Sequence, residues 1–275
     1  MQRPFRTTAY RYPNERLILV ITLTLVSLVI ALTATATLCL SAVFVLSVVL
    51  LSYQSSRALH RALLELAFQV NANTIPELAA IVEVTKARLQ AHDLEVFVAR
   101  SSVPNAYTFG LLPPKIVVLH SVLLQWMDQD ELIFILGHEM GHVRLGHTWL
   151  NTLIGGMAGI PSSFSAAAIL ALAFRWWNRA CEYSADRAGL LACGRPDKAI
   201  SALVKLVAGG ESHSAAGLER VLARIESEDD YLPGSLGELL GTHPMMIRRI
   251  GQIRRYAASP EYARLQSMMN RNLSI

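Results

Sequence analysis

The chain is poor in charged residues, and one long stretch has none. Of its 275 residues only 17% are Asp, Glu, Lys or Arg, whereas a soluble domain carries about a quarter. From Leu17 to Gln54 there is no Asp, Glu, Lys, Arg or His at all. The mean hydropathy is accordingly positive, at +0.35. These shortages argue against an ordinary soluble domain and indicate a membrane protein.

The uncharged run is too long for one membrane crossing. Its roughly 38 residues would span about 57 Å as a single helix, nearly twice the hydrocarbon thickness. Two helices that turn near Thr33–Thr37 fit better. Basic residues flank both ends, where the positive-inside rule places them in the cytoplasm: Arg3, Arg6, Arg11 and Arg16 before the run, and Arg57, His60 and Arg61 after it. We predict a cytoplasmic N-terminus over 1–16, a transmembrane hairpin over 17–54 and a cytoplasmic domain over 55–275.

A cleaved signal peptide is the alternative interpretation of this run. Ala34-Thr35-Ala36 resembles a small-residue cleavage site. A second apolar stretch follows at once, however, and would still anchor the product. The hairpin is therefore the favoured prediction.

Cysteine is scarce, and basic residues form no stripe. Cys39, Cys181 and Cys193 are odd in number and form no C-x-x-C pair, which excludes a disulfide framework and indicates a reducing compartment. The net charge is +4, but no basic stretch is interleaved with aromatic residues. That excess fits anionic lipid headgroups, so we expect a lipid bilayer and no nucleic acid as partner.

Periodicity and turn residues outline the region after the hairpin. We expect helices over Ser55–Gln69 and Pro76–Leu89, and strands over Leu94–Ala99 and Lys115–His120 with a loop between the strands. Asp128 and Glu131 have capping-box spacing and begin a further helix. Later helices are expected near 180–191, 197–207, 218–225 and 247–256. Residues 145–174 again lack charged side chains; they are a third span, a shallow hairpin of two short helices, or a buried hairpin outside the membrane.

The helix that begins after Asp128 carries His138-Glu139-Met140-Gly141-His142, an H-E-x-x-H pattern. Residues four apart lie about 40° apart around a helix, so both imidazoles can ligate one zinc ion. The glutamate between them then lies beside the zinc-bound water. We predict His138 and His142 as metal ligands and Glu139 as the general base.

A catalytic zinc site needs a third protein ligand, with the fourth position left to water. No carboxylate lies between His142 and Cys181; the first is Glu182, and Asp186 follows one helical turn later. We predict Glu182 as the third ligand and Asp186 as the acceptor of a hydrogen bond from a ligand imidazole. The alternative is an exposed helix face on which both acids pair with neighbouring arginines.

Helix geometry decides the role of His147, and the shared metal site limits how residues 145–174 can cross a membrane. On a continuous helix His147 lies about 140° from His142, so we reject it as a ligand. Because His142 and Glu182 must meet at one ion, the segment between them crosses the membrane an even number of times, dips in and returns, or stays outside.

Four motifs in order resemble the HtpX-like membrane zinc metallopeptidases, family forty-eight of the metallopeptidases, and the related type-1 CAAX prenyl proteases. They are His-Glu-Met-Gly-His, Glu182-x-x-x-Asp186-x-x-Gly189, the segment Asn105-Ala106-Tyr107-Thr108-Phe109-Gly110, and Thr242-His243-Pro244 with Arg249-Ile250. The resemblance implies a mainly α fold with a small β-sheet, an α+β gluzincin-type metallopeptidase domain, besides the N-terminal hairpin. Cys181-Glu182-Tyr183 and Met245 depart from the family pattern and leave the subgroup open.

The predicted function is a membrane-bound zinc metalloendopeptidase with one Zn²⁺ per chain. Asn105 and the strand Lys115–His120 are expected to hold an extended peptide, and His243 or Arg249 to stabilise the oxyanion. For His243 a purely structural role stays open. We expect misfolded membrane proteins as substrates rather than prenylated ones, and an active site on the cytoplasmic face of a bacterial inner membrane. The alternatives are a catalytically silent, zinc-stabilised membrane scaffold or chaperone, and a membrane anchor with an accidental motif.

Overall fold

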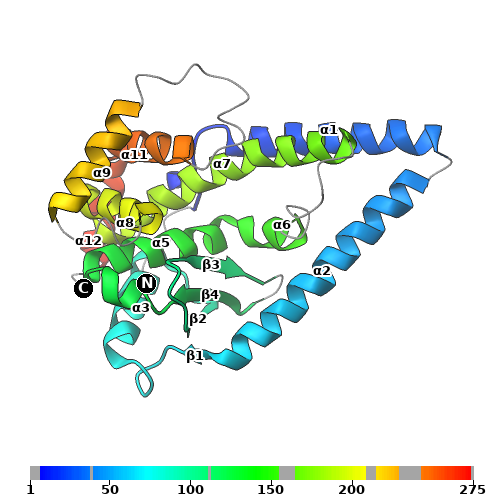
Figure 1. The fold of residues 1–275 in the computed structure, drawn as a ribbon. Helices are drawn as coiled ribbons and strands as arrows, with labels where there is room; N and C mark the ends of the chain where they lie inside the picture. The colour runs from blue at the N-terminus through cyan, green and yellow to red at the C-terminus, as the bar shows by residue number, and fades with distance from the viewer. Residues whose placement is uncertain are drawn as a thin grey trace.

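The computed structural model describes residues 7–37, 40–110, 113–154, 165–208, 215–228 and 243–273. Helices surround one small sheet, which confirms the mainly α class with a small β component (Figure 1). In chain order the elements are η1 (Thr7–Tyr10), α1 (Glu15–Ala36), α2 (Leu40–Leu66), β1 (Ala67–Gln69), α3 (Pro76–Leu89), β2 (Leu94–Ala99), β3 (Ala106–Phe109), β4 (Lys115–His120), α4 (Leu123–Trp126), α5 (Gln129–Leu145), α6 (His147–Ile154), α7 (Ser165–Cys193), α8 (Pro196–Ala208), α9 (Ala215–Glu228), α11 (His243–Ala257) and α12 (Pro260–Leu273).

The sheet has the strand order β1-β2-β4-β3, with β2 and β4 parallel and the outer pairs antiparallel. The predicted strands Leu94–Ala99 and Lys115–His120 are β2 and β4, with the same bounds. The loop expected between them contains a further strand, β3, so that expectation is wrong. Its Tyr-Thr-Phe sequence suits a strand, but at four residues it is too short for a clear alternation. Consequently β4 is an inner strand, and β3 rather than Lys115–His120 is the edge.

The helix that leaves the apolar run also ends earlier than expected. Helix α2 stops at Leu66, and the next three residues form β1, which pairs with β2 through Ala67 and Ala99. The prediction of helix through Gln69 is therefore wrong for its last turn, because pairing with β2 satisfies that backbone instead.

The N-terminal apolar run forms two helices that diverge from their connection (Figure 1). Helix α1 ends at Ala36 and α2 begins at Leu40, close to the turn expected near Thr33–Thr37. Among the described residues, α1 alone is long and apolar enough to cross a membrane, with an 18-residue window of mean hydropathy 2.8 that is 11% buried. The structure thus supplies one candidate span and does not establish the pair as a membrane hairpin.

Helix α7 joins two regions that the sequence analysis treated separately. It runs unbroken from Ser165 to Cys193, so the second half of the apolar region and the segment with Glu182 are one helix. No glycine or proline interrupts residues 165–188, which explains the continuity. Its first half lies alongside α1 (Figure 1). Residues 155–164, in the middle of the apolar region predicted over 145–174, lie outside the described residues.

Helices α5 and α7 approach each other through glycine, and this approach positions the site. A Cβ on Gly141 would lie 2.7 Å from the Cβ of Ala188, and one on Gly189 would lie 2.7 Å from the carbonyl oxygen of Phe134. Both distances are shorter than van der Waals contact allows. Only glycine at these positions lets the two backbones come this close.

The start of α5 is fixed by the predicted capping box. The Asp128 side chain accepts a hydrogen bond from the backbone N–H of Glu131, and the Glu131 side chain accepts one from the backbone N–H of Asp128. Glu131 is buried and also pairs with Lys205 of α8 at 2.7 Å. These contacts set the start of the helix, and thereby the direction in which its later turns present their side chains.

Candidate metal centre

The two motif histidines lie on one face of α5 with their Nε2 atoms turned toward each other. The Nε2 atoms of His138 and His142 are 3.2 Å apart. Two nitrogens that ligate one tetrahedral zinc ion, each at about 2.0–2.1 Å, stand about 3.3 Å apart. The spacing therefore suits a shared ion.

Glu182 of α7 supplies a carboxylate opposite the two histidines. Its Oε2 lies 3.5 Å from Nε2 of His138, and its Oε1 lies 3.4 Å from Nε2 of His142. One ligand atom from each of the three residues lies within 4.8 Å of the others. The structure thus brings together the three predicted ligands, and they could hold one metal ion.

His138 is supported from behind by a buried carboxylate. Its Nδ1 lies 2.9 Å from Oδ1 of Asp186, whose side chain is 1% exposed. Asp186 in turn receives two hydrogen bonds from Arg249 of α11, at 2.8 and 2.6 Å, and Arg249 also lies 3.1 Å from Oε2 of Glu182. Although burial opposes ionisation, Arg249 lowers the pKa of Asp186 and holds that of Glu182 well below its usual value. Both acids are therefore ionised.

His142 is supported by another histidine. Its Nδ1 lies 2.9 Å from Nδ1 of His147, whose Nε2 lies 3.1 Å from Oε1 of Glu15 at the start of α1. Burial, assisted by the neighbouring His142, lowers the pKa of His147 to about 2, so its ring is neutral. A neutral ring has one donor and one acceptor nitrogen. His147 can thus accept from His142 at Nδ1 and donate to Glu15 at Nε2.

The turn after α5 makes this contact possible. The helix ends at Leu145, and Gly146 adopts the left-handed conformation with φ 79°. The rejection of His147 rested on a helix that continues, and that premise is wrong. The chain instead turns at Gly146, and His147 contacts His142, which it supports without belonging to the ligand group of the two motif histidines and Glu182.

Glu15 is a buried carboxylate with several partners. It is 2% exposed and receives hydrogen bonds from Arg11 and from Ser184 of α7, besides His147. Cys181 lies close enough for Glu15, His147 and Cys181 to form a second ligand cluster. Burial raises the pKa of the Cys181 thiol, however, and hydrogen bonds already occupy the other two residues. This cluster is better explained as a hydrogen-bond network than as a metal site.

The donor set fits a divalent cation. With both Nδ1 atoms engaged by Asp186 and His147, the Nε2 lone pairs of His138 and His142 are left for a metal. Although burial opposes its charge, hydrogen bonds to Asp186 and Glu182 raise the pKa of His138 to about 10. Carboxylates that stabilise a proton there would also stabilise a metal ion.

Glu139 lies at a pocket of about 360 Å³ beside the sheet edge. The pocket is lined by the two motif histidines, Glu139 and Glu182, and by Pro104–Thr108 at the edge strand. Thr108 of β3 donates a hydrogen bond to Oε2 of Glu139. Thr108 is not among the residues predicted from the sequence, although it lies inside the Asn-Ala-Tyr-Thr-Phe-Gly motif. Its hydroxyl fixes the orientation of the glutamate that the motif places next to the metal ligands.

The remaining predicted site residues lie at different distances from this centre. Asn105 is exposed, lines the pocket and accepts the backbone N–H of His120 through its own carbonyl at 3.0 Å. Arg249 lines the pocket as well, but its guanidinium contacts carboxylates. His243 is the first residue of α11, and its side chain lies outside the described part of the structure.

Comparisons with known proteins identify the family of the chain. Residues 72–257 match the model of peptidase family M48. The chain is 28% identical over 220 residues to a plastoglobule-localized metallopeptidase from Arabidopsis thaliana, covering 75% of this chain and 64% of the relative, so it spans less than two thirds of that protein. It is 27% identical over 222 residues to a protease HtpX homolog from Pseudarthrobacter chlorophenolicus (70% of this chain, 77% of the relative) and 25% identical over 227 residues to one from Ralstonia pickettii (70% and 78%). The chain therefore belongs to peptidase family M48 and is an HtpX-like metallopeptidase.

Proposed function

We propose that this protein is a membrane-bound, zinc-dependent metalloendopeptidase that cleaves polypeptides at the centre formed by α5 and α7. One observation carries the proposal: the ligand atoms of His138, His142 and Glu182 converge beside Glu139, in a pocket bordered by the edge strand. The family model supports the peptidase class, and the names of the relatives agree with it.

Zinc is the ion that the donor set favours. Two imidazoles and one carboxylate are a ligand set of catalytic zinc sites, which keep a further position for water. When bound, the ion acidifies that water and polarises the scissile carbonyl.

The chain's own residues then move the protons. Glu139 accepts a proton from the attacking water and delivers it to the leaving amine. Thr108 donates to one carboxylate oxygen of Glu139, which leaves the other free to accept. Asp186 and His147 keep the imidazoles in the tautomer that presents Nε2 to the metal.

The edge of the sheet offers a surface for the substrate backbone. Strand β3 pairs with β4 on one side and ends the sheet on the other. An extended peptide can add to such an edge through main-chain hydrogen bonds. Asn105, the residue before β3, would bind the peptide near its cleaved bond. His243 stays our prediction for the oxyanion stabiliser, while Arg249 is assigned to holding Asp186 and Glu182.

The membrane placement rests on α1. Its exposed side chains are large and apolar, including Leu17, Val20, Leu28 and Leu32 at 52–62% exposure, which is costly in water and favourable in lipid. We propose that α1, the apolar part of α2 and the first half of α7 enter the bilayer, and that the active site faces the cytoplasm of a bacterial cell. Misfolded membrane proteins are the proposed substrates.

The test measures zinc binding and peptide cleavage separately. Full-length protein in detergent is compared with Glu139→Gln for zinc content and for cleavage of casein. The variant should keep about one zinc ion per chain and lose cleavage by roughly 10²–10⁴-fold, the usual contribution of a general base. A chelator should abolish cleavage by the wild type, and added zinc should restore it. Normal turnover in Glu139→Gln would refute the mechanism, and zinc without any cleavage by the wild type would favour the silent scaffold.

A further inference from the structure

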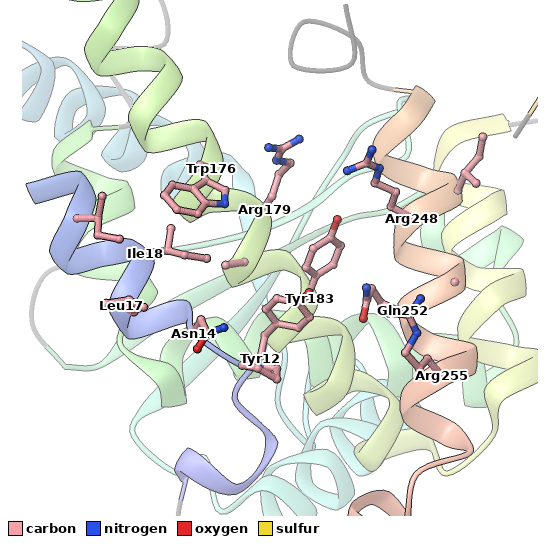
Figure 2. Close-up of a pocket in the computed structure, with 15 residues that line it drawn as sticks. Tyr12, Asn14, Leu17, Ile18, Trp176, Arg179, Tyr183, Arg248, Gln252 and Arg255 are labelled. Carbon is pink, nitrogen blue, oxygen red and sulfur yellow. The ribbon is translucent and has the colours of Figure 1, made fainter. Parts of the chain in front are cut away.

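A second pocket, of about 670 Å³, lies at the base of α1, between α1, α7 and α11. Figure 2 shows it with Leu17, Ile18 and Trp176 on one side and Arg248, Gln252 and Arg255 on the other. None of its lining residues lines the pocket of the metal centre. Neighbouring residues of the same helices nevertheless face the two pockets, since Tyr183 follows Glu182 and Arg248 precedes Arg249. The two pockets therefore use different faces of α7 and α11.

One wall of this pocket is apolar and continues into the proposed membrane helix. Leu17, Ile18 and Ile21 of α1 line it, and the exposed apolar side chains of α1 continue beyond them as far as Leu32. Trp176 of α7 lines the same wall and is 42% exposed. Tryptophan is enriched where a membrane protein meets the headgroup region. An alkyl chain that left the pocket along α1 would stay on apolar surface.

The rest of the lining is positively charged. Arg179, Arg248 and Arg255 contribute guanidinium groups, and the described lining residues include no Asp or Glu. Within the described part of the chain, neither Arg179 nor Arg255 forms an ion pair with a carboxylate. Figure 2 shows Arg179 and Arg248 near each other at one end of the pocket, with the hydroxyl of Tyr183 below them. Guanidinium groups pair well with phosphate oxygens, and Arg179 and Arg255, which form no ion pair with a described carboxylate, favour an anion in this pocket.

The position of the pocket, at the start of the uncharged run, indicates which kind of anion it binds. The uncharged run begins at Leu17, one residue after Arg16, so the pocket lies where α1 passes from water into the bilayer. Headgroup phosphates lie at this level, and basic clusters beside membrane helices attract anionic lipids. A free phosphate ion would leave the apolar wall without a partner, and an acidic peptide would not account for its continuation along α1.

We propose that this pocket binds the headgroup of one anionic phospholipid, with an acyl chain lying along α1. The inference rests on the membrane placement proposed above and adds a lipid site on the face of α7 and α11 that does not line the metal centre. Arg179 binds the phosphate at the end of the pocket that Arg248 shares, Arg255 contacts the headgroup at the other end, and Leu17 and Trp176 contact the start of the acyl chains. A phosphatidylglycerol headgroup should therefore be selected over phosphatidylcholine.

Gly251 allows the pocket to be blocked without a change in charge. It lines the pocket, and a Cβ built on it meets no described atom within 4 Å. Leucine is also a better helix former than glycine, so Gly251→Leu should not destabilise α11. Its side chain would occupy space that the headgroup needs, whereas Gly251→Ala is too small to do so.

The experiment counts lipids on the full-length protein in non-ionic detergent by native mass spectrometry. Dioctanoyl phosphatidylglycerol, dioctanoyl phosphatidylcholine and inorganic phosphate are titrated separately, and an acidic peptide is added as a competitor to the phosphatidylglycerol complex. We expect saturable binding of one phosphatidylglycerol, about tenfold tighter than phosphatidylcholine. The double variant Arg179→Gln/Arg255→Gln should lose roughly 30-fold in affinity, since each basic residue near the surface contributes about one kcal/mol. Gly251→Leu should also lose binding, while Gly251→Ala and the exposed control Arg264→Gln should bind as the wild type does.

Several outcomes would overturn the lipid site. Equal binding of the two lipids, or an equal loss in Arg264→Gln, would show unselective adsorption. Inorganic phosphate that binds as tightly as phosphatidylglycerol would identify a free-anion site, and displacement of the lipid by an acidic peptide would identify a protein-binding site. Protein that stays in solution without detergent would refute the membrane placement itself. Zinc content and casein cleavage of the same preparations report on the peptidase proposal independently.

Discussion

The two metal-ligating histidines are held from behind in different ways. His138 meets a carboxylate directly, because Asp186 is 2.9 Å from its Nδ1 and is itself clamped by Arg249. His142 meets a neutral imidazole first, and the carboxylate comes one step further away, in the contact of His147 with Glu15. We call these the Asp186 arm and the His147 arm. Both leave Nε2 for the metal, but the carboxylate of each arm comes from a different part of the chain.

That difference connects the metal centre to different structural elements. The Asp186 arm lies within the peptidase domain, on α7 and α11. The His147 arm ends at Glu15, the first residue of α1, and α1 is the proposed membrane helix. A shift of α1 relative to α5 would thus reach His142 through the contacts of Glu15 with His147 and of His147 with His142. One of the two imidazoles therefore has support that ends on α1, whereas the support of the other ends on α11.

Removing the charge of the Asp186 arm should have the largest effect. Asp186→Asn keeps an acceptor for His138 but leaves Arg249, whose side chain is 15% exposed, without its closest anion. Breaking a buried ion pair in this way costs about 3 kcal/mol of folding free energy. Loss of a carboxylate behind a ligand lowers metal affinity by about 100-fold. Chelator competition and unfolding in detergent measure the two quantities. Unchanged zinc affinity would show that Asp186 does not support His138.

Removing the acceptor of the His147 arm should have a smaller effect. His147→Phe fills a similar volume but cannot accept from His142, so we expect zinc affinity to fall by about tenfold. The cost is smaller because Glu15, the buried charge that loses His147, keeps Arg11 and Ser184 as hydrogen-bond donors. His147→Asn is the matched control, because its carbonyl oxygen can accept near the position of Nδ1, and it should recover most of the affinity. Equal losses in the two variants would mean that His147 acts by packing alone.

The Asp186 arm could be predicted from the sequence, and the reason is local spacing. His138 and His142 are four residues apart on one helix, as are Glu182 and Asp186, so helical geometry alone puts each pair on one face. Elimination chose Glu182, since no carboxylate lies between His142 and Cys181. The strands β2 and β4 and the capping box of α5 were likewise found from local patterns.

The His147 arm could not be predicted, because it depends on a turn and on a distant contact. His147 contacts His142 only because α5 ends at Leu145 and the chain turns at Gly146. On a continuous helix His147 would point away from His142. Glu15 precedes His147 by 132 residues, and nothing in local spacing connects them. One signal was present: Glu15 is the only acidic residue among the first 64. An acid placed against an apolar run needs a partner, and that requirement could have prompted a search for one. Thr108 was missed for a related reason, since β3 is too short to show its periodicity.

Replacing the last residue of the His147 arm should have a still smaller effect. Glu15→Gln keeps an acceptor for Nε2 of His147 and removes only the charge, so zinc affinity should fall by about threefold. A cobalt-substituted preparation should show a small change in its visible spectrum, since His142 loses part of its support. Ser184→Ala is the control: it removes another partner of Glu15 without touching His147, and it should leave the spectrum as it is. A loss in Glu15→Gln greater than that in His147→Phe would show that Glu15 acts by another route.

The smallest expected effect is also the sharpest test of two separate arms. If Glu15 acts through His147, then Glu15→Gln added to His147→Phe should change zinc affinity no further, because the connection is already broken. If the arms are independent, Asp186→Asn added to His147→Phe should multiply the two separate losses, within the factor of about two that additivity allows. Chelator competition on the three single and two double variants measures both couplings. If Glu15→Gln still lowered zinc affinity by about threefold in the His147→Phe background, Glu15 would not act on His142 through His147. The proposed connection between α1 and the metal centre would then be wrong.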